Sequence, residues 1–373
     1  MKMKVKKRLR MACVACMILN NYSAFALINN LKTNITIAQL PSRGVKVQQL
    51  LTEYKDGADA IGHSQCIVTL AMGTVVNEGG ILTEDGYILE DTQTSLQDQH
   101  KLKNQNRNIN NENPMFFSGK LAVIASAGSE NWYHWLLQVL PRLIMLDLSK
   151  IDYDRIYINN LKYEWQNRSL DAVLDYLKIP REKLCIINGN AIIQAETLIV
   201  PCIPFIPLKI KDYLPSWMQH KLREIFLNNY VVNTKHNTFE KIYISRKNAS
   251  IRRITNEATL THTLKTFGFK ILHLETLSPQ EQAKFFNKAK IIVGPHGSGF
   301  ANLIFANPGY KLIEIDHGMV GAAQRSFYKK FTSLTRGHYI PFYVDRTTEE
   351  HLEDDIIVNI EKFISFLKDN GAL

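Results

Sequence analysis

Beyond residue 240 the chain alternates short apolar segments with segments of helical periodicity, and this alternation constrains the fold more than any other feature. Runs of β-branched residues predict strands, and apolar residues recurring every three or four positions predict helices. Strands that alternate with helices pair in parallel, because each helix returns the chain to the starting edge of the sheet. The predicted strands are 241–245, 269–274, 290–293 and 311–315, and the predicted helices are 256–267 and 279–288, the latter opened by a Ser278/Glu281 capping box.

The chain between residues 66 and 200 shows the same alternation less regularly. Short β-branched runs predict strands at 66–70, 120–125, 155–158, 184–187 and 197–200. A stretch rich in Asn and Gln, residues 91–114, predicts a solvated loop. A chain of 373 residues exceeds what one hydrophobic core organises. We therefore predict an α/β protein of two Rossmann-like domains, residues 27–235 and 236–373, joined near 230–240.

The first 26 residues have the pattern of a targeting segment. A basic start, MKMKVKKRLR, precedes a nine-residue apolar stretch, and Ala24-Phe25-Ala26 then fits a cleavage site for export. The apolar stretch is short for a bilayer span. We predict that residues 1–26 direct the chain to the secretory or export pathway and that the mature chain begins near Leu27. An uncleaved, weakly inserted anchor with peripheral membrane association is the alternative.

The charge favours a small anionic ligand over a nucleic acid. The formal net charge is +10, but six of the basic residues lie in the first ten positions, which leaves +4 for the rest of the chain. Dense stripes of Lys and Arg interleaved with aromatic residues, the usual footprint of a nucleic-acid surface, are not present in the sequence. We therefore expect no nucleic-acid partner.

The cysteines do not form a pattern typical of disulfides or zinc. Cys13 and Cys16 lie in the targeting segment, and the remaining three are odd in number and widely spaced. Cys66, Cys185 and Cys202 are predicted to be small buried apolar residues.

The stretch GPHGSGFANLIFANPG, residues 294–309, follows a predicted buried strand and suggests a phosphate site. In a doubly wound sheet the loop that leaves the carboxyl end of a strand lines the ligand crevice, and a helix starting at Gly299 would direct its free amides there. Gly297 and Gly299 allow a phosphate to approach the backbone, Ser298 adds a hydroxyl, and Asn302 is placed to hold the loop. The stretch therefore predicts a diphosphate cradle.

Two other features would complete this cradle. The loop after strand 241–245 carries Arg246, Lys247, Arg252 and Arg253, and arginine forks suit phosphate oxygens. Glu314, near the end of the next strand, could accept from ribose hydroxyls or could be a surface cap or ion pair.

Three other interpretations of residues 294–309 were weighed. A nicotinamide site is disfavoured because the third glycine of its fingerprint is missing. A hydrolase nucleophile elbow fails because His296 and Phe300 occupy the glycine positions around Ser298. A purely structural turn stays open.

Three segments together resemble glycosyltransferase family 61: YISRKNASIRRITNE, IIVGPHGSGFANLIFANPGYKLIEI and ENWYHWLLQVLPRL. The resemblance covers roughly residues 65–345. It implies a GT-B architecture and inverting transfer, without a metal or other cofactor, from a nucleotide-diphosphate sugar donor to a glycan or glycoprotein acceptor. By motif position it implies donor-binding roles for Arg246, Arg253, Asn256, Glu257, His296, Gly297, Ser298, Gly299, Asn302 and Glu314.

Inversion needs a base for the acceptor proton, and the segment around residue 130 offers two candidates. A helix beginning there would place Glu130 and His134 four residues apart on one face. His134 is the first candidate and Glu130 the second. His134 packed among aromatic residues, with one hydrogen bond and no catalytic role, is the alternative.

Two further questions stay open at this stage. Asp152-Tyr153-Asp154 matches a D-x-D metal motif, but it precedes its predicted strand rather than following it, so we expect a solvated turn and no metal. A catalytically silent protein that binds sugar nucleotides or glycans would have the same fold, since fold does not determine activity.

Overall fold

The computed structural model describes residues 34–35, 45–49, 66–89, 115–186, 191–204, 214–228, 239–316, 322–344 and 355–373. The predicted targeting segment 1–26, the loop 91–114 and the predicted domain boundary at 235/236 lie outside the described residues. The described residues form two compact units, the first holding residues up to 204 together with 215–218, and the second holding Leu214 and the residues from 219 onward. Within the described residues, no helix is both long enough and apolar enough to span a membrane.

The second unit is built on a parallel five-stranded sheet with the order β12-β11-β13-β14-β15. The first strand in sequence thus lies between the second and the third, which is a doubly wound order with its switch point between β11 and β13. The strands are β11 (Lys241–Ile244), β12 (Lys270–Leu272), β13 (Ile291–Pro295), β14 (Lys311–Asp316) and β15 (His338–Tyr343). The predicted parallel Rossmann-like sheet is therefore present in this unit.

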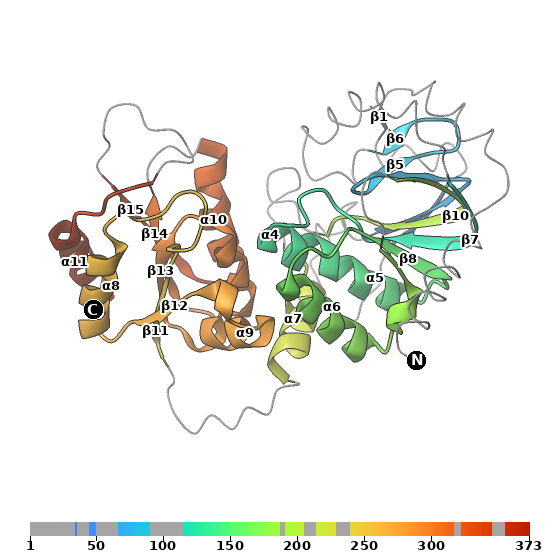
Figure 1. Cartoon of the computed structure of the whole chain (residues 1–373). Helices are drawn as coiled ribbons and strands as arrows, with labels where there is room; N and C mark the ends of the chain where they lie inside the picture. Colours follow the sequence, from blue (N-terminus) through green and yellow to red (C-terminus); the bar gives the residue numbers. More distant parts are fainter. Residues whose placement is uncertain are drawn as a thin grey trace, which may run out of the picture. The chain divides into compact units, whose positions relative to one another are not determined.

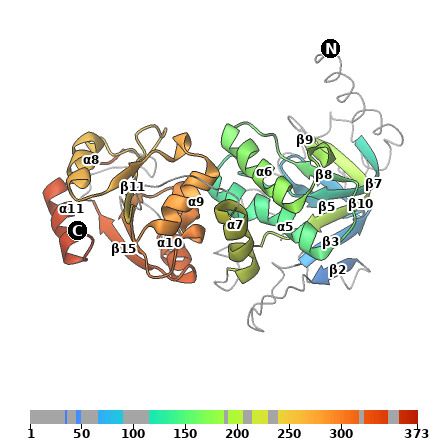
Figure 2. The same ribbon diagram turned by 90° about the horizontal axis from the view of Figure 1, so that it is seen from below.

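Helices cover both faces of this sheet. In Figures 1 and 2, α8 (Glu257–Thr266) and α11 (Ile360–Asp369) lie on one face, and α9 (Pro279–Lys288) and α10 (Ala322–Leu334) lie on the other. Leu260 and Leu264 of α8 and Phe363 of α11 are fully buried in the core beneath the first face. The segment after β13 is a 3₁₀-helix, η9 (Ser298–Phe305), and a short turn η8 (Leu274–Thr276) follows β12.

The first unit contains a mixed sheet. Its parallel part has the order β10-β7-β8-β9, and antiparallel strands extend it beyond β10. The parallel strands are β7 (Met115–Val123), β8 (Arg155–Ile158), β9 (Leu184–Ile186) and β10 (Ile192–Pro201), and the others are β1 (Asn34–Ile35), β2 (Lys46–Gln49), β3 (Cys66–Ala71), β4 (Thr74–Val76), β5 (Gly80–Leu82) and β6 (Ile88–Leu89).

Helices follow the parallel strands of the first unit. The chain leaving β7 forms α4 (Trp132–His134), a π-helical turn η6 (Trp135–Val139) and α5 (Leu140–Ser149), and the chain leaving β8 forms α6 (Glu164–Leu177). Helices α5 and α6 pack against each other and lie on the same side of the sheet in Figure 1. A short turn η7 (Arg181–Lys183) precedes β9. Helix α7 (Ser216–Asn228) belongs to the first unit only at residues 216–218, and its residues from 219 onward belong to the second.

The mixed sheet differs from the Rossmann-like arrangement expected for this unit, and its turns explain why. Met72 and Asn77 adopt φ angles of 49° and 50°, and Gly79 and Gly86 adopt 107° and 88°. β3 and β4 run in the same direction along β10, with Met72 between them. The left-handed residues after β4 and β5 form tight reversals, so β4, β5 and β6 fold back on one another in place of crossing through helices.

The three cysteines within the described residues form no disulfide and are buried, as predicted. The predicted capping box at α9 is also present: the Ser278 hydroxyl accepts from the Glu281 amide at 3.2 Å, and Glu281 accepts from the Ser278 amide at 2.8 Å.

We predict that Ser278→Ala lowers the stability of the second unit by about 1 kcal/mol, because the substitution removes a cap from the helix preceding β13. The midpoint of its thermal transition should fall by about 2 to 4 °C. Ser333→Ala is the matched control, since Ser333 is exposed in the last turns of α10. Equal melting temperatures for the two variants would contradict the prediction.

Candidate functional site

The carboxyl ends of β11 and β13 lie side by side at the switch point of the second sheet. Residues 241–243 of β11 pair with residues 291–293 of β13, so the chain leaving β11 at Ser245 and the chain leaving β13 at His296 emerge at the same edge. Ligands of doubly wound folds bind at such a point. The predicted cradle therefore lies beside the loop that carries Arg246, Lys247, Arg252 and Arg253, which we call the arginine loop.

Glu257, in the first turn of α8, binds the end of β11. Its carboxylate is 6% exposed and accepts hydrogen bonds from the Tyr243 hydroxyl at 2.8 Å, the Ser245 hydroxyl at 2.9 Å and the Arg246 amide at 3.1 Å. Burial and the nearby carboxylate raise the pKa of Tyr243, so its hydroxyl remains a donor. Glu257 is thus engaged by the strand end and positions the residue that follows it.

Arg246 is held in one orientation by backbone oxygens. Its Nη2 donates to the Ile251 carbonyl at 2.9 Å and its Nε donates to the Arg252 carbonyl at 3.3 Å. The remaining nitrogen, Nη1, lies beside Gly297, where a Cβ atom would overlap it. Burial, and then the positive charge of Arg252, lower the pKa of Arg246. The guanidinium group is therefore directed at the loop after β13 in a setting that disfavours its charge.

Arg252 was expected only as one of four cations in this loop, without a donor-binding role of its own. Its φ angle is 55°, which is uncommon for a residue with a side chain and costs on the order of 1 to 3 kcal/mol. Its Nε is buried and has no hydrogen-bond partner among the described residues. A strained backbone and a buried guanidinium nitrogen without an acceptor are both typical of a binding position. The only sequence signal was its place in the cationic loop.

Arg253 and Asn256 contact the segment before α11. The Arg253 guanidinium binds Asp355 through Nη2 at 2.6 Å and Nε at 2.9 Å, and lowers the pKa of that carboxyl group. Asn256 donates to the Val358 carbonyl at 2.8 Å and accepts from the Val358 amide at 3.1 Å. Both residues therefore fasten the arginine loop to residues 355–358, and we name these contacts the C-terminal clasp.

His296 is paired with a buried acid. Its Nδ1 lies 2.6 Å from Oε1 of Glu314, and the Tyr339 hydroxyl donates to the other carboxylate oxygen at 2.7 Å. Glu314 is only 2% exposed. Both of its oxygens are therefore engaged within the described residues, which leaves little access for ribose hydroxyls and favours the ion pair that was the other expectation for it.

Tyr328 of α10 packs against the His296 ring. Its hydroxyl donates to the Gly297 carbonyl at 2.6 Å, and its ring meets the His296 ring edge to face at a centroid distance of 5.0 Å. Burial, and then the charge of Glu314, raise the pKa of Tyr328, so its hydroxyl stays protonated. Helix α10 thus fixes both the histidine and the loop after it.

The rest of the predicted cradle consists of the start of η9, which no described side chain caps, and the buried Asn302, which holds it in place. Gly297 and Ser298 open η9, and no side-chain bond caps its first amides among the described residues. Asn302 is fully buried and donates to Gln282 at 2.9 Å and to the Gly299 carbonyl at 3.1 Å, so it holds η9 against α9. The loop-holding role predicted for Asn302 is confirmed by these contacts.

The structure separates the two candidate bases of the first unit. The helix begins at Trp132 after the cap Asn131, so Glu130 lies before the helix. The prediction that Glu130 and His134 lie one turn apart on the same helical face is therefore wrong. Glu130 is ion-paired with Lys162, whereas His134 Nδ1 lies 2.7 Å from the Gln138 Oε1. The side chain of Asn131 accepts from the Tyr133 amide at 2.9 Å, and this cap sets the later helix start.

The aspartates of the D-x-D motif are exposed and lie before β8. Asp152 pairs with the Lys120 ammonium at 3.1 Å, and Asp154 accepts from the Lys120 amide at 2.8 Å. Among the described residues no group of three or more His, Cys, Asp or Glu side chains is placed to hold a metal ion.

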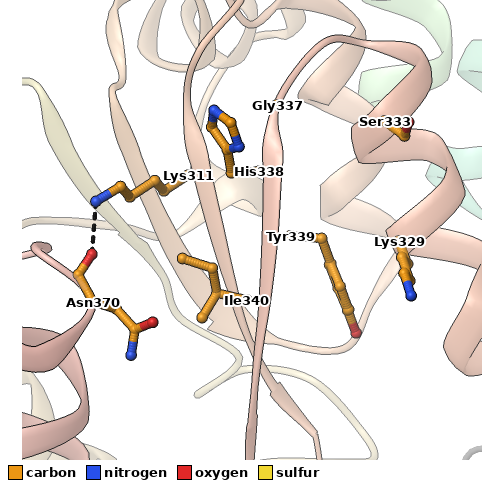
Figure 3. Close-up of a pocket in the computed structure, with 8 residues that line it drawn as sticks. All are labelled: Lys311, Lys329, Ser333, Gly337, His338, Tyr339, Ile340 and Asn370. Atoms are coloured by element: carbon orange, nitrogen blue, oxygen red, sulfur yellow. Dashed lines mark hydrogen bonds between the residues drawn. The ribbon is translucent and has the colours of Figure 1, made fainter.

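A hollow of about 510 Å³ lies elsewhere in the second unit, at the edge strand β15. Figure 3 shows Tyr339 and Ile340 pointing to opposite sides of this strand. Lys311, at its rim, is engaged by the carbonyls of Asn370 and Gly371 at 2.6 and 3.1 Å. The hollow straddles a sheet edge and shares only Tyr339 with the candidate site.

We predict that Gly297→Ala weakens the binding of nucleoside diphosphates by about tenfold or more, equivalent to ~1.4 kcal/mol, because the new methyl group displaces the Arg246 guanidinium. Ser298→Ala should cost less, since it removes one neutral hydrogen bond of about 0.5 to 1.5 kcal/mol. Titration calorimetry on the folded variants measures both effects.

Gly294→Ala is the control for Gly297→Ala. A Cβ atom at Gly294 would lie 3.0 Å from the Ile244 Cβ and 3.2 Å from its carbonyl oxygen, so this change should lower the melting temperature and leave the affinity of the folded protein unchanged. The same signature in Gly297→Ala would identify the stretch as a structural turn.

Comparison with known families matches a part of the chain that holds most of the loop residues of the candidate site. Residues 132–313 match the model of the family described as Glycosyltransferase 61, and this range contains His134, the arginine loop and the loop after β13. The search of curated proteins returned no match to the chain. The match confirms the family resemblance of the three sequence segments over a shorter range than predicted. This region of the chain belongs to glycosyltransferase family 61.

Proposed function

We propose that the protein is an inverting glycosyltransferase that moves a sugar from a nucleotide-diphosphate sugar to a hydroxyl group of a glycan or glycoprotein acceptor. Family membership supports glycosyl transfer in general. The donor class is inferred from the candidate site of the second unit, and the inverting stereochemistry is carried over from the family resemblance.

One observation carries the donor assignment: two guanidinium groups lie together at the switch point, and no described carboxylate binds either of them. Arg246 uses two nitrogens on backbone carbonyls, and Arg252 has a buried Nε without a partner. Like charges held together in a partly buried place repel each other, and an anion between them would relieve this. A diphosphate supplies several oxygens in the geometry that arginine forks bind.

The neighbouring loop adds donors for the same anion. The first amides of η9 carry no side-chain cap. Because Gly297 has no side chain, Arg246 Nη1 can lie against its backbone. Ser298 is partly exposed beside them. Free amides at a helix start favour a phosphate group. The sugar and the nucleoside would then extend from this point, and we do not assign their identities.

We further propose a GT-B arrangement in which residues 236–373 bind the donor and residues 27–235 bind the acceptor. His134 is our first candidate for the base, because its Nδ1 is occupied by Gln138 and its Nε2 has no partner among the described residues. Glu130 is weaker as a candidate, since its carboxylate is ion-paired with Lys162.

The proposal is tested by titrating uridine, guanosine and adenosine diphosphates and their common sugar conjugates into the purified protein, followed by an assay for sugar release or transfer. Tight binding with turnover supports the enzyme. Binding without transfer to any acceptor or water would favour a silent sugar-nucleotide-binding protein. Absence of binding by every nucleotide would overturn the donor assignment.

We predict that Arg246→Ala and Arg252→Ala each weaken nucleoside diphosphate binding by about 2 to 4 kcal/mol, because each removes a charge-assisted contact to phosphate. Arg253→Ala is the matched comparison: it also removes one arginine of this loop, but its guanidinium is bound to Asp355. Its loss of affinity should be several times smaller. A larger effect for Arg253→Ala than for Arg252→Ala would reverse our assignment.

We also propose that residues 1–26 target the chain for export, as the sequence pattern alone suggests. A chain that starts at Leu27 should fold and keep its nucleotide affinity. Amino-terminal sequencing of the protein from its native source should begin near Leu27, and recovery of the intact basic start would favour the membrane anchor.

A further inference from the structure

We infer that Glu314 is a positioning residue that holds His296 as an imidazolium ion, with its Nε2–H directed at the diphosphate of the donor. The inference rests on the proposed donor class and goes beyond it, because it assigns a charge state and a role to a pair that the sequence analysis treated as two separate ligands.

The geometry determines which ring nitrogen can meet a ligand. Nδ1 of His296 lies 2.6 Å from Oε1 of Glu314, a distance typical of a charge-assisted hydrogen bond. Nε2 has no partner among the described residues, and it is not among their buried polar atoms without a partner. Nε2 is therefore the nitrogen left to contact a ligand, and a carboxylate on the opposite nitrogen fixes the orientation of the ring.

Both carboxylate oxygens of Glu314 are held by neighbouring side chains. Tyr339 donates to its second oxygen at 2.7 Å. Burial raises the pKa of the Tyr339 hydroxyl, and the Glu314 charge raises it further, so this hydroxyl is a donor at neutral pH. A carboxylate that accepts two hydrogen bonds in a buried place has its charge stabilised by them, and it can in turn stabilise a positive ring.

Charges of both signs lie near His296 and its neighbour Tyr328. Arg246 and Arg252, from the loop after β11, act on Tyr328, and Glu257 on α8 acts on Arg246, whereas Glu314 on β14 contacts the His296 ring directly. Tyr328 on α10 and Tyr339 on β15 are neutral donors. A bound diphosphate would add negative charge on the Nε2 side and so favour the imidazolium ion. The imidazolium would then stabilise charge that develops on the departing nucleoside diphosphate.

Two variants separate this role from simple stabilisation of the sheet. Glu314→Gln keeps the size of the side chain and removes its charge, and Tyr339→Phe removes one hydrogen bond and keeps the charge. Tyr310→Phe is the control for a lost buried hydroxyl, because Tyr310 pairs with Thr335 at 2.6 Å outside the candidate site. All three are expected to lower the melting temperature by similar amounts.

The first readout uses the ligand-free protein. With selectively ¹⁵N-labelled histidine, and His296 assigned through His296→Asn, the titration of its ring is followed by NMR. Glu314→Gln should move the titration midpoint down by about one pH unit or more, because an adjacent carboxylate favours the charged ring. Tyr339→Phe should not move it down, because the carboxylate remains. An unchanged midpoint in Glu314→Gln would overturn the inference without bearing on the donor class.

The second readout uses uridine, guanosine and adenosine diphosphates. Glu314→Gln and His296→Asn should each weaken binding about tenfold, and proton uptake on binding near neutral pH, measured by calorimetry in two buffers, should be lost in His296→Asn. Tyr339→Phe should weaken binding less than threefold. Failure of every diphosphate to bind the unmodified protein would refute the proposed function. Normal binding by folded Glu314→Gln would refute the positioning role alone.

Discussion

The buried carboxylate of Glu257 is the interaction on which the candidate site depends. It accepts hydrogen bonds from two side chains at the end of β11 and from the amide of Arg246, at 2.8, 2.9 and 3.1 Å. A buried carboxylate without these donors would be very costly, so the strand end and the start of α8 are obliged to stay together. The direction in which the chain leaves β11, and with it the location of Arg246, follows from this requirement.

The loop after β11 is held by residues 355–358 as well as by Glu257. Residues 355–358 lie about a hundred positions away in sequence, yet Asp355 binds Arg253 and Val358 exchanges hydrogen bonds with Asn256. These contacts flank Arg252, whose left-handed backbone would otherwise relax. The C-terminal clasp therefore helps to maintain a residue with left-handed backbone at the switch point.

Two residues of the candidate site, Arg246 and His296, each contact a buried acid. Glu257 fixes the backbone of Arg246, and Glu314 fixes the ring of His296. In this arrangement the acids orient the two residues and leave the Arg246 guanidinium and the His296 Nε2 uncontacted by them, since they bind the backbone amide in one case and Nδ1 in the other. Preorganised donors of this kind are effective in binding because little reorganisation remains when the ligand arrives. In the first unit, His134 is oriented in a similar way, but by the neutral amide side chain of Gln138.

The sequence by itself determined the parallel sheet of the second unit, the placement of the loop after β13 at its carboxyl edge, the cap at Ser278 and the family. These features follow from local periodicity and short motifs, which neighbouring residues set. Only the tertiary structure distinguished Arg252 from Arg253, showed that both oxygens of Glu314 are engaged by His296 and Tyr339, and placed Glu130 outside the helix of His134. It also gave the first unit a mixed sheet. The reason is physical: adjacent arginines are equivalent in sequence, and the partner that neutralises one of them lies 102 residues away, where only the folded chain brings it into contact.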